Sequence, residues 1–512
     1  MIRTRFAPSP TGYLHIGGVR TALFNWLFTR GKNGTFVLRI EDTDTERNKP
    51  EALQPIIDGF KWLGIHWDEG PEVNGPYAPY FQSQRFDLYK KAAMQLLETG
   101  HAYPDYLTKE QLDVDRKAAE AAKKPYVHRG PHRETAAAEC VRLYNEKPTA
   151  LRLKVPAGRS VVIDDVIRGR VEVQTDTIGD PVILRPDGRP LYNFAVVVDD
   201  VGMKITHVIR AAEHLSNTPT QVLIYEALDY PMPTFAHVPV VNEPGSKKKL
   251  SKRDMKKFVT AEVKAKLRAI GYSDADIESR DDLNPATVAF YRELGYLPQA
   301  LVNYLARLGW SLDDKTEVIS LQDLVANFGL DRVSSAPASF DPDKLYWLAG
   351  EYMRVLPIEE KVAGCAPFLQ RAGLLPADIT AEQRDRLTKV VIACGDRLKL
   401  FSDILTYGSP FFRPDPTYEP KAIEKRLKKA GAADLLRAFA AELSNVEPFD
   451  APTVDKALHN FCASRNLKPG ELVHPVRVAV TGVEVGPGLF DCLAILGRDK
   501  VLRRIELAVK LA

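Results

Sequence analysis

The chain has 512 residues, of which 45% carry apolar side chains and 27% charged ones, and its formal net charge is +3. This is the composition of a globular protein with several domains, and it excludes a disordered, collagen-like or low-complexity chain. Because no stretch reaches the ~18 uninterrupted apolar residues of a bilayer span, and Met1–Pro8 holds no apolar signal core, we expect a soluble cytoplasmic protein without a membrane partner.

The N-terminal residues predict the start of a parallel sheet. Arg3–Ala7 is a short extended run, Val19–Thr29 has apolar residues at helical spacing, and Thr35–Ile40 has strand composition. A strand, a crossover helix and a second strand form a βαβ unit, whose strands are parallel. Because ligands of such sheets collect at the carboxyl ends of the strands, Ala7–Ser9 and Glu41 are candidate site residues.

The next part of the chain reads as an inserted module, after which the sheet resumes. A polar helix is expected over Thr108–Lys124, followed by short β-type runs. Strands are then expected over Tyr192–Val198, Ile205–Arg210 and Val238–Val241, with a lysine-rich loop after the last of them. The β-type runs of the module are Leu151–Val155, Ser160–Ile163 and Arg170–Gln174.

From Lys256 onward nearly all of the chain has helical periodicity, and we find no internal repeat and no long linker. The second half is therefore predicted to be all-helical. The expected helices are Glu262–Ile270, Pro285–Leu294, Pro298–Leu308, Ile358–Ala372, Ala381–Leu405, Ala422–Ser444, Thr453–Asn466 and Leu489–Leu511.

The cysteines and histidines give no support for a metal site. The five cysteines lie far apart and form no C-x-x-C pair, so we expect neither a disulfide framework nor a cysteine-built zinc site. His128 and His132 have the spacing of helical metal ligands, but Gly130 and Pro131 between them would break such a helix. With 70 basic and 67 acidic residues, a nucleic acid would have to be held by local basic patches.

Two short segments have the chemistry of phosphate binding. In His15–Gly18 two glycines at a helix start let backbone amides approach a phosphate, although a plain glycine-rich turn would look the same. In Lys247–Arg253 the ammonium groups could neutralise a leaving pyrophosphate, although a solvated basic loop or an RNA-binding patch would also be basic. Since neither a P-loop nor G-x-G-x-x-G is present, the two segments together favour adenylyl transfer.

Several long motifs, in order, resemble the class I aminoacyl-tRNA synthetases and, more narrowly, the bacterial glutamyl-tRNA synthetase family. The main ones are Ala7–Gly18, Leu38–Asp44 and Lys249–Arg253. The resemblance covers almost the whole chain and implies a class I α/β fold: a Rossmann-like parallel sheet with an inserted α/β module, followed by an all-helical C-terminal half. Further matching segments are Gly188–Phe194, Thr206–Arg210, Gly295–Leu301 and Pro475–Gly482.

The resemblance also implies an activity, which is ATP-dependent ligation of L-glutamate to tRNA(Glu) through a glutamyl adenylate, with Mg²⁺ accompanying ATP. It implies that His15, Lys249 and Lys252 are catalytic, with Lys252 reaching the ATP phosphates at the transition state. The residues implied to contact ATP are His15, Gly17, Gly18, Glu213, Lys249, Leu250, Ser251, Lys252 and Arg253.

The glutamate site implied by the resemblance agrees with the chemistry of its residues. Glu41 can take the α-ammonium group, and an arginine fork suits the side-chain carboxylate. Singly, each residue has a plainer explanation, such as a half-buried strand aromatic for Tyr192 or a charged strand end for Glu41; only the joint pattern favours a site. The residues implied to contact glutamate are Arg5, Ala7, Ser9, Glu41, Tyr192 and Arg210.

The resemblance divides the chain into five parts. Residues 1–102 and 188–255 are the two halves of the catalytic domain, and 103–187 is an inserted module for the acceptor end. Residues 256–338 are a helical stem-contact region, which departs from the family by an insertion near 258–286, and 339–512 are a helical anticodon-binding domain. Some relatives hold zinc through cysteines in the inserted module; Tyr103–Tyr106 supplies none, so no zinc is predicted.

Some alternatives remain open at this stage. A non-discriminating enzyme that also glutamylates tRNA(Gln) would have the same motifs, and a non-catalytic tRNA-binding protein could have kept the fold. The helical C-terminal half disfavours a glutaminyl enzyme of the eukaryotic type, whose anticodon region is made of β-barrels. The family usually works as a monomer, which is the state we expect.

Overall fold

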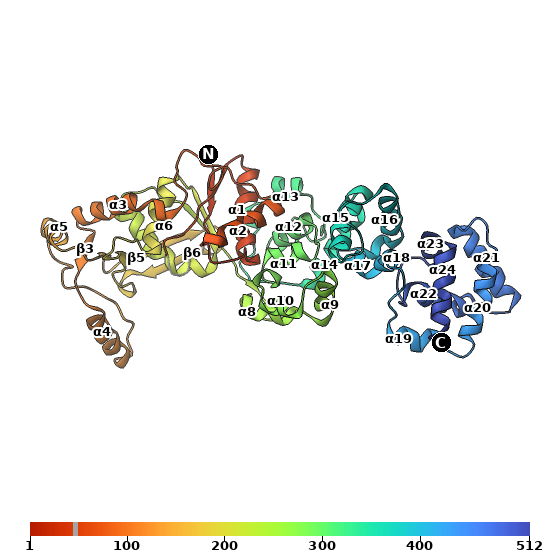
Figure 1. The fold of residues 1–512 in the computed structure, drawn as a ribbon. Coiled ribbons are helices and arrows are strands. Elements are labelled where there is room, and N and C mark those ends of the chain that lie inside the picture. The colour runs from red at the N-terminus through yellow and green to blue at the C-terminus, as the bar shows by residue number, and fades with distance from the viewer. Residues whose placement is uncertain (45–49) are drawn as a thin grey trace. The chain divides into compact units, whose positions relative to one another are not determined.

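The computed structural model describes residues 1–44 and 50–512, apart from the side chains of Pro50 and Lys252 (Figure 1). The chain forms two compact units. The first comprises Met1–Met255, Ala286–Ala289 and Val302–Asp341, and the second Lys256–Pro285, Phe290–Leu301 and Pro342–Ala512. Among the described residues, no helix combines the length and the apolar character needed to cross a membrane.

The first unit contains parallel strands, as predicted, but the strand expected over Val238–Val241 instead covers Thr234–Val238, because Pro239 has no amide hydrogen to continue the ladder. β1 (Arg3–Phe6) pairs with β2 (Thr35–Leu38), and β8 (His207–Ala211) pairs with β9 (Thr234–Val238), both in parallel. Hydrogen bonds between Arg3 and Thr206 join the two pairs, so the strands lie in the order β2, β1, β8, β9. Helix α1 (Ile16–Gly31) connects β1 to β2; its residues from Val19 to Thr29 are all buried, as expected of a helix that is apolar on several sides.

The inserted part of the first unit consists of short antiparallel strands and two helices (Figure 1). A three-stranded sheet has β4 between β3 and β7, and β5 and β6 form a hairpin. The hairpin joins the parallel strands, because the amide of Val166 donates to the carbonyl of Phe235 on β9. The elements are β3 (Ala102–Asp105), α4 (Lys109–Ala121), α5 (Ala137–Glu146), β4 (Ala150–Leu153), β5 (Ser160–Asp165), β6 (Gly169–Gln174) and β7 (Val182–Leu184).

The strand predicted over Tyr192–Val198 is wrong. These residues belong to helix α6 (Tyr192–Gly202), in which Phe194–Asp200 are all buried. A short continuous apolar run fits a buried helix as well as a buried strand, and periodicity cannot separate the two. Packing decides here, since α6 lies against α7 (Thr218–Ala227) and α3 (Phe86–Glu98).

The second half of the chain is helical, as predicted, but three of the long predicted helices are interrupted. The predicted helix 489–511 breaks at Gly497 (φ 78°) and the one at 422–444 breaks before Gly431 (φ 82°), because a left-handed residue cannot continue an α-helix. The helices are α8 (Lys252–Met255), α9 (Ala261–Ile270), α10 (Asp274–Ser279), α11 (Val288–Glu293), α12 (Pro298–Arg307), α13 (Leu321–Asn327), α14 (Pro342–Val355), α15 (Ile358–Arg371), α16 (Ala381–Cys394), α17 (Asp403–Tyr407), α18 (Ser409–Phe412), α19 (Pro420–Ala422), α20 (Ala432–Leu443), α21 (Ala451–Ser464), α22 (Pro469–Thr481), α23 (Leu489–Leu496) and α24 (Arg498–Val509).

A buried ion network joins α6 to the parallel strands. The carboxylate of Asp200 accepts from Arg5 Nε at 3.0 Å and from Arg39 Nη1 at 2.6 Å, and all three side chains are at most 5% exposed. Burial alone would raise the pKa of Asp200, but the two guanidinium groups outweigh it and hold the pKa below its ordinary value. Asp200 thus sets the position of Arg5 and of Arg39.

Replacing Asp200 with Asn should strongly destabilise the first unit, because two buried guanidinium groups would lose their nearest carboxylate. We expect the free energy of unfolding to fall by about 3 kcal/mol, measured by native-state hydrogen exchange of amides in β1 and α6. Asp187→Asn is the matched control: Asp187 pairs with Arg189 on an exposed turn, so its loss should cost less than about 1 kcal/mol. Equal, small effects of both substitutions would contradict this account.

Candidate functional site

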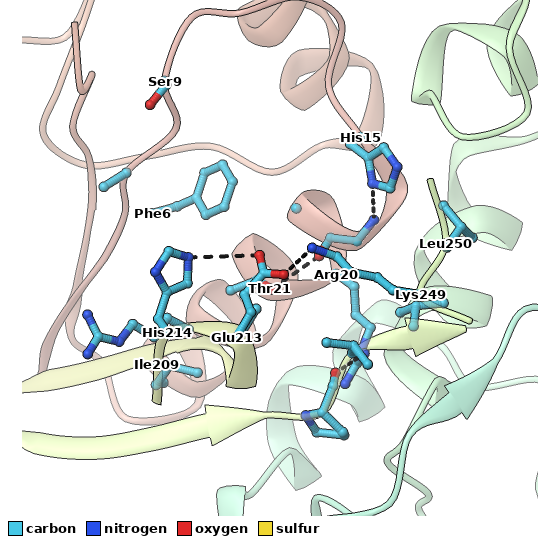
Figure 2. A pocket seen from close by; sticks show the side chains of 18 of the residues that line it. Phe6, Ser9, His15, Arg20, Thr21, Ile209, Glu213, His214, Lys249 and Leu250 are labelled. Atoms are coloured by element: carbon cyan, nitrogen blue, oxygen red, sulfur yellow. Dashed lines mark hydrogen bonds and ion pairs between the residues drawn. The ribbon is translucent and has the colours of Figure 1, made fainter. Parts of the chain in front are cut away.

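A cavity of about 840 Å³ opens where the carboxyl ends of β1 and β8 meet the start of α1. Figure 2 shows side chains that line it, contributed by segments far apart in the sequence. Thirteen of the fifteen residues that the sequence placed in the site line this one cavity. They are Arg5, Ala7, Ser9, His15, Gly17, Gly18, Glu41, Tyr192, Arg210, Glu213, Lys249, Leu250 and Ser251.

His15 begins helix α1 at one end of the cavity. It occupies the N-cap position with an extended backbone, and its Nδ1 accepts the amide hydrogen of Gly17 at 3.1 Å. Because Nδ1 is an acceptor, a neutral imidazole carries its proton on Nε2, which can then donate. Gly17 and Gly18 also line the cavity, so a ligand meets backbone amides at the positive end of a 16-residue helix. This end of the cavity suits a phosphate.

The lysine-rich loop reaches the same cavity through a tight reversal of the chain. The amide of Leu250 donates to the carbonyl of Val241 at 2.8 Å, and the amide of Glu243 donates to the carbonyl of Lys248 at 2.9 Å. These two bonds bring Lys249 back beside β10 (Val241–Asn242). Lys249 Nζ forms an ion pair with Glu213 (Figure 2). Both side chains are substantially exposed, and since such pairs are weak, Lys249 can exchange Glu213 for an anionic ligand.

The loop then enters α8 through Ser251. Its hydroxyl accepts from the amide of Asp254 at 3.2 Å and lies 2.9 Å from a carboxylate oxygen of the same residue, as a helix-capping serine does. Arg253 is not among the residues that line the cavity, and the side chain of Lys252 lies outside the described part of the structure. The roles predicted for these two residues stay predictions.

Arg210 lies in the other part of the cavity and retains an unused donor. Its Nε donates to His237 Nε2 at 3.0 Å and its Nη2 to Thr218 Oγ1 at 2.9 Å, while Nη1 has no hydrogen-bond partner among the described residues. The side chain is 5% exposed, and burial lowers the pKa of its guanidinium. A buried guanidinium with a spare donor is a strong binding group for a carboxylate.

Glu41 and Tyr192 complete this part of the cavity. Burial raises the pKa of Glu41 to about 7, against the opposing charges of Arg39 and Arg5. Burial also raises the pKa of Tyr192 to about 12, so its phenol stays protonated, 3.2 Å from Nδ1 of His214. Burial lowers the pKa of His214 to about 4, which keeps its imidazole neutral. Glu41 can therefore gain or lose its negative charge near pH 7, beside the fixed positive charges of Arg39 and Arg5.

Sequence reasoning missed several residues of the cavity wall. Arg20 is 2% exposed on the largely buried helix α1 and donates from Nη1 to the carbonyl of Pro239 at 2.7 Å; an arginine on a buried helix face was the available signal. His214 and Asn217 follow the carboxyl end of β8, where the strand-end rule would have placed them. The other wall residues not predicted are Phe6, Thr21, Ile209, Ala211, Pro239, Val240 and Val241.

Comparison with known proteins identifies the family. A family model described as the catalytic domain of class I tRNA synthetases (E and Q) matches residues 1–272 and 268–347, and one described as an anticodon binding domain matches 360–509. The chain is 41% identical over 510 residues to the glutamate–tRNA ligase of Moorella thermoacetica, which covers 99% of this chain and 98% of that protein. The chain belongs to the glutamate–tRNA ligase family.

Two other members of the glutamate–tRNA ligase family are similar to this chain over nearly its full length. Glutamate–tRNA ligase 1 of Caldanaerobacter subterraneus is also 41% identical, over 99% of this chain and 98% of its own length. The crystal structure of a glutamate tRNA ligase from Elizabethkingia meningosepticum in complex with its amino acid has a TM-score of 0.85 at 34% identity, covering 99% of each chain. The family resemblance and the fold class predicted from the sequence are therefore confirmed.

The raised pKa of Glu41 predicts how amino-acid binding depends on pH. If Glu41 receives the ammonium group of glutamate, as the sequence predicts, protonation of its carboxyl below about pH 7 removes the attraction. We expect the dissociation constant for glutamate, measured by calorimetry, to rise about tenfold from pH 8 to pH 6, whereas His214 does not titrate in this range. Glu41→Gln should bind more weakly at pH 8 and show no such rise; an unchanged slope would contradict the role.

Proposed function

We propose that the chain ligates L-glutamate to the 3′ end of tRNA(Glu) through a glutamyl adenylate, with ATP as the energy source. The observation that carries this proposal is the shared cavity: the His15 helix start and Lys249 line it together with the buried, partly unpartnered guanidinium of Arg210. One part suits a triphosphate and the other a carboxylate side chain. The relatives that match over nearly their full length are named glutamate–tRNA ligases, which supports the same function.

The first step is activation of the amino acid. An oxygen of the α-carboxylate of glutamate attacks the α-phosphorus of ATP, and the bond to the β-phosphate breaks, so that pyrophosphate leaves. Glu41 holds the α-ammonium group, while Arg5, Tyr192 and Arg210 hold the side-chain carboxylate next to Ala7 and Ser9. The protein contributes alignment and charge stabilisation and needs no covalent nucleophile.

The phosphates are held by the other part of the cavity. His15 Nε2 and the backbone amide of Gly18 contact them, with Gly17, Glu213, Leu250 and Ser251 alongside. Lys249 and Lys252, with Arg253, neutralise the charge that develops on the leaving pyrophosphate. This assignment places the two ammonium groups where the charge changes most during the reaction.

Metal ions enter this scheme only with the nucleotide. The described residues form no group of three or more His, Cys, Asp or Glu side chains that could hold a metal ion, so we propose that Mg²⁺ is carried by the triphosphate, on which it offsets negative charge. We also propose that residues 103–187 hold no zinc. His128 there lies against protein groups on both ring nitrogens: its Nε2 is 3.1 Å from Asp105 Oδ2, and its Nδ1 is 3.0 Å from the hydroxyl of Tyr126.

In the second step the 2′-hydroxyl of the terminal ribose of tRNA attacks the carbonyl carbon of the adenylate, and AMP leaves. We propose that residues 103–187 receive the acceptor end, 256–338 the stem and 339–512 the anticodon. The match of residues 360–509 to an anticodon binding domain supports the last assignment. We further propose that the enzyme acts in the cytoplasm as a monomer.

The proposal is tested by charging purified tRNA(Glu) and tRNA(Gln) transcripts with radiolabelled glutamate or glutamine. We expect glutamate, and not glutamine, to be attached to tRNA(Glu). Glutamate on both transcripts would identify a non-discriminating enzyme, with the same chemistry and a broader tRNA choice. Binding of tRNA without charging or ATP–pyrophosphate exchange, with glutamate present, would contradict the proposal and identify a non-catalytic tRNA-binding protein.

A variant separates catalysis by this chain from a contaminating activity. Lys252→Ala should abolish charging while the affinity for tRNA is retained, because one lysine contributes little to a long RNA interface. Unchanged turnover would refute the role of Lys252.

A further inference from the structure

His237 lies directly behind Arg210. The two residues are register partners on the parallel strands β8 and β9, and the side chain of His237 is fully buried. Its Nε2 accepts from Arg210 Nε at 3.0 Å and lies 3.1 Å from Thr218 Oγ1. His237 does not line the cavity, so it can act on a ligand only through Arg210.

Asp165 in turn holds His237 by its other ring nitrogen. This fully buried carboxylate ends strand β5, and its Oδ2 lies 2.6 Å from His237 Nδ1. Its Oδ1 accepts the backbone amides of Ile167 at 3.0 Å and Arg168 at 2.8 Å, and the amide of His237 also donates to the carboxylate. The orientation of Asp165 is therefore determined by the backbone around it.

This arrangement selects one form of the imidazole. A carboxylate facing Nδ1 requires the proton there, which leaves the lone pair of Nε2 to accept from Arg210. Burial, together with the guanidinium groups of Arg210 and Arg168, lowers the pKa of His237 and outweighs the opposing effect of Asp165, so the ring stays neutral. A proton on Nε2 would instead face the N–H of Arg210 Nε.

We propose that Asp165 and His237 are positioning residues that fix which edge of the Arg210 guanidinium faces the amino-acid side chain, and that they thereby set the selectivity for glutamate over glutamine. The inference rests on the proposed function. Glutamate and glutamine have nearly the same size, so a site can separate them only through charge and the direction of its donors. With Nε and Nη2 bonded from behind, the guanidinium cannot turn. Either oxygen of a carboxylate can accept from it, whereas glutamine must accept with its one amide oxygen and keep its NH₂ away from the donors.

The decisive variant is Asp165→Asn. Because backbone amides hold the Oδ1 position, the amide oxygen of Asn is expected there and its NH₂ at the Oδ2 position, where it donates to His237 Nδ1. The proton then moves to Nε2 and the bond to Arg210 is lost. We expect the KM for glutamate to rise about tenfold to hundredfold and the ratio of kcat/KM for glutamate over glutamine to fall by at least about tenfold, with the KM for ATP unchanged.

Two substitutions of His237 and a control complete the test. His237→Gln can place Oε1 near the position of Nε2 and should restore most of the glutamate KM, whereas His237→Leu should behave like Asp165→Asn. Asp164→Asn, an exposed neighbour on the same strand, should match the wild type. ATP–pyrophosphate exchange with tRNA present gives the kinetic constants, and circular dichroism reports folding.

The outcomes distinguish the inference from the function on which it rests. If the wild type charges glutamate but folded Asp165→Asn keeps its glutamate KM and its selectivity, the inference is wrong and the proposed function stands. An equal rise in the KM for ATP would also overturn the inference, since that indicates a general structural role. If the wild type does not charge tRNA with glutamate at all, both the inference and the proposed function are wrong. If His237→Leu fails to fold, the results for Asp165→Asn and His237→Gln decide whether the inference is correct.

Discussion

The burial of arginine side chains beneath one cavity is the constraint on which the rest of this site depends. A guanidinium group removed from water needs charge or hydrogen bonds in return. Asp200 supplies charge to Arg5 and Arg39, whereas among the described residues Arg210 donates to the neutral side chains of His237 and Thr218. The guanidinium of Arg210 is therefore bonded to no carboxylate among the described residues, and the side chain of an acidic amino acid would provide one. Selectivity for an acidic substrate follows from this imbalance.

The two parts of the cavity differ in rigidity in a way that suits the reaction. Arg210 and His237 are buried, and Arg210 is hydrogen-bonded from behind, so the geometry of its guanidinium is set before a ligand arrives. Lys249 is exposed and forms an ion pair with Glu213, which is also exposed, and such a pair is readily exchanged. Recognition of an amino acid needs fixed donors, whereas a leaving pyrophosphate needs charges that can follow it.

The sequence predicted those parts of the site that depend on local pattern. The βαβ unit, the glycine pair after His15 and the lysine-rich loop are all readable over a few residues, and they lie as expected. The helical state of Tyr192–Gly202 was not readable, because its apolar run has no periodicity. The chain from Asp165 through His237 to Arg210 depends on the register of β8 and β9 and on a hairpin 72 residues before His237; no local pattern could reveal it.

The central claim is that glutamate and the adenosine phosphates occupy one cavity. A nonhydrolysable sulfamoyl analogue of glutamyl adenylate tests it directly by steady-state inhibition of charging, with its stoichiometry measured by calorimetry. The account predicts one analogue molecule per chain, competitive with both glutamate and ATP. Competition with only one of the two substrates would contradict it.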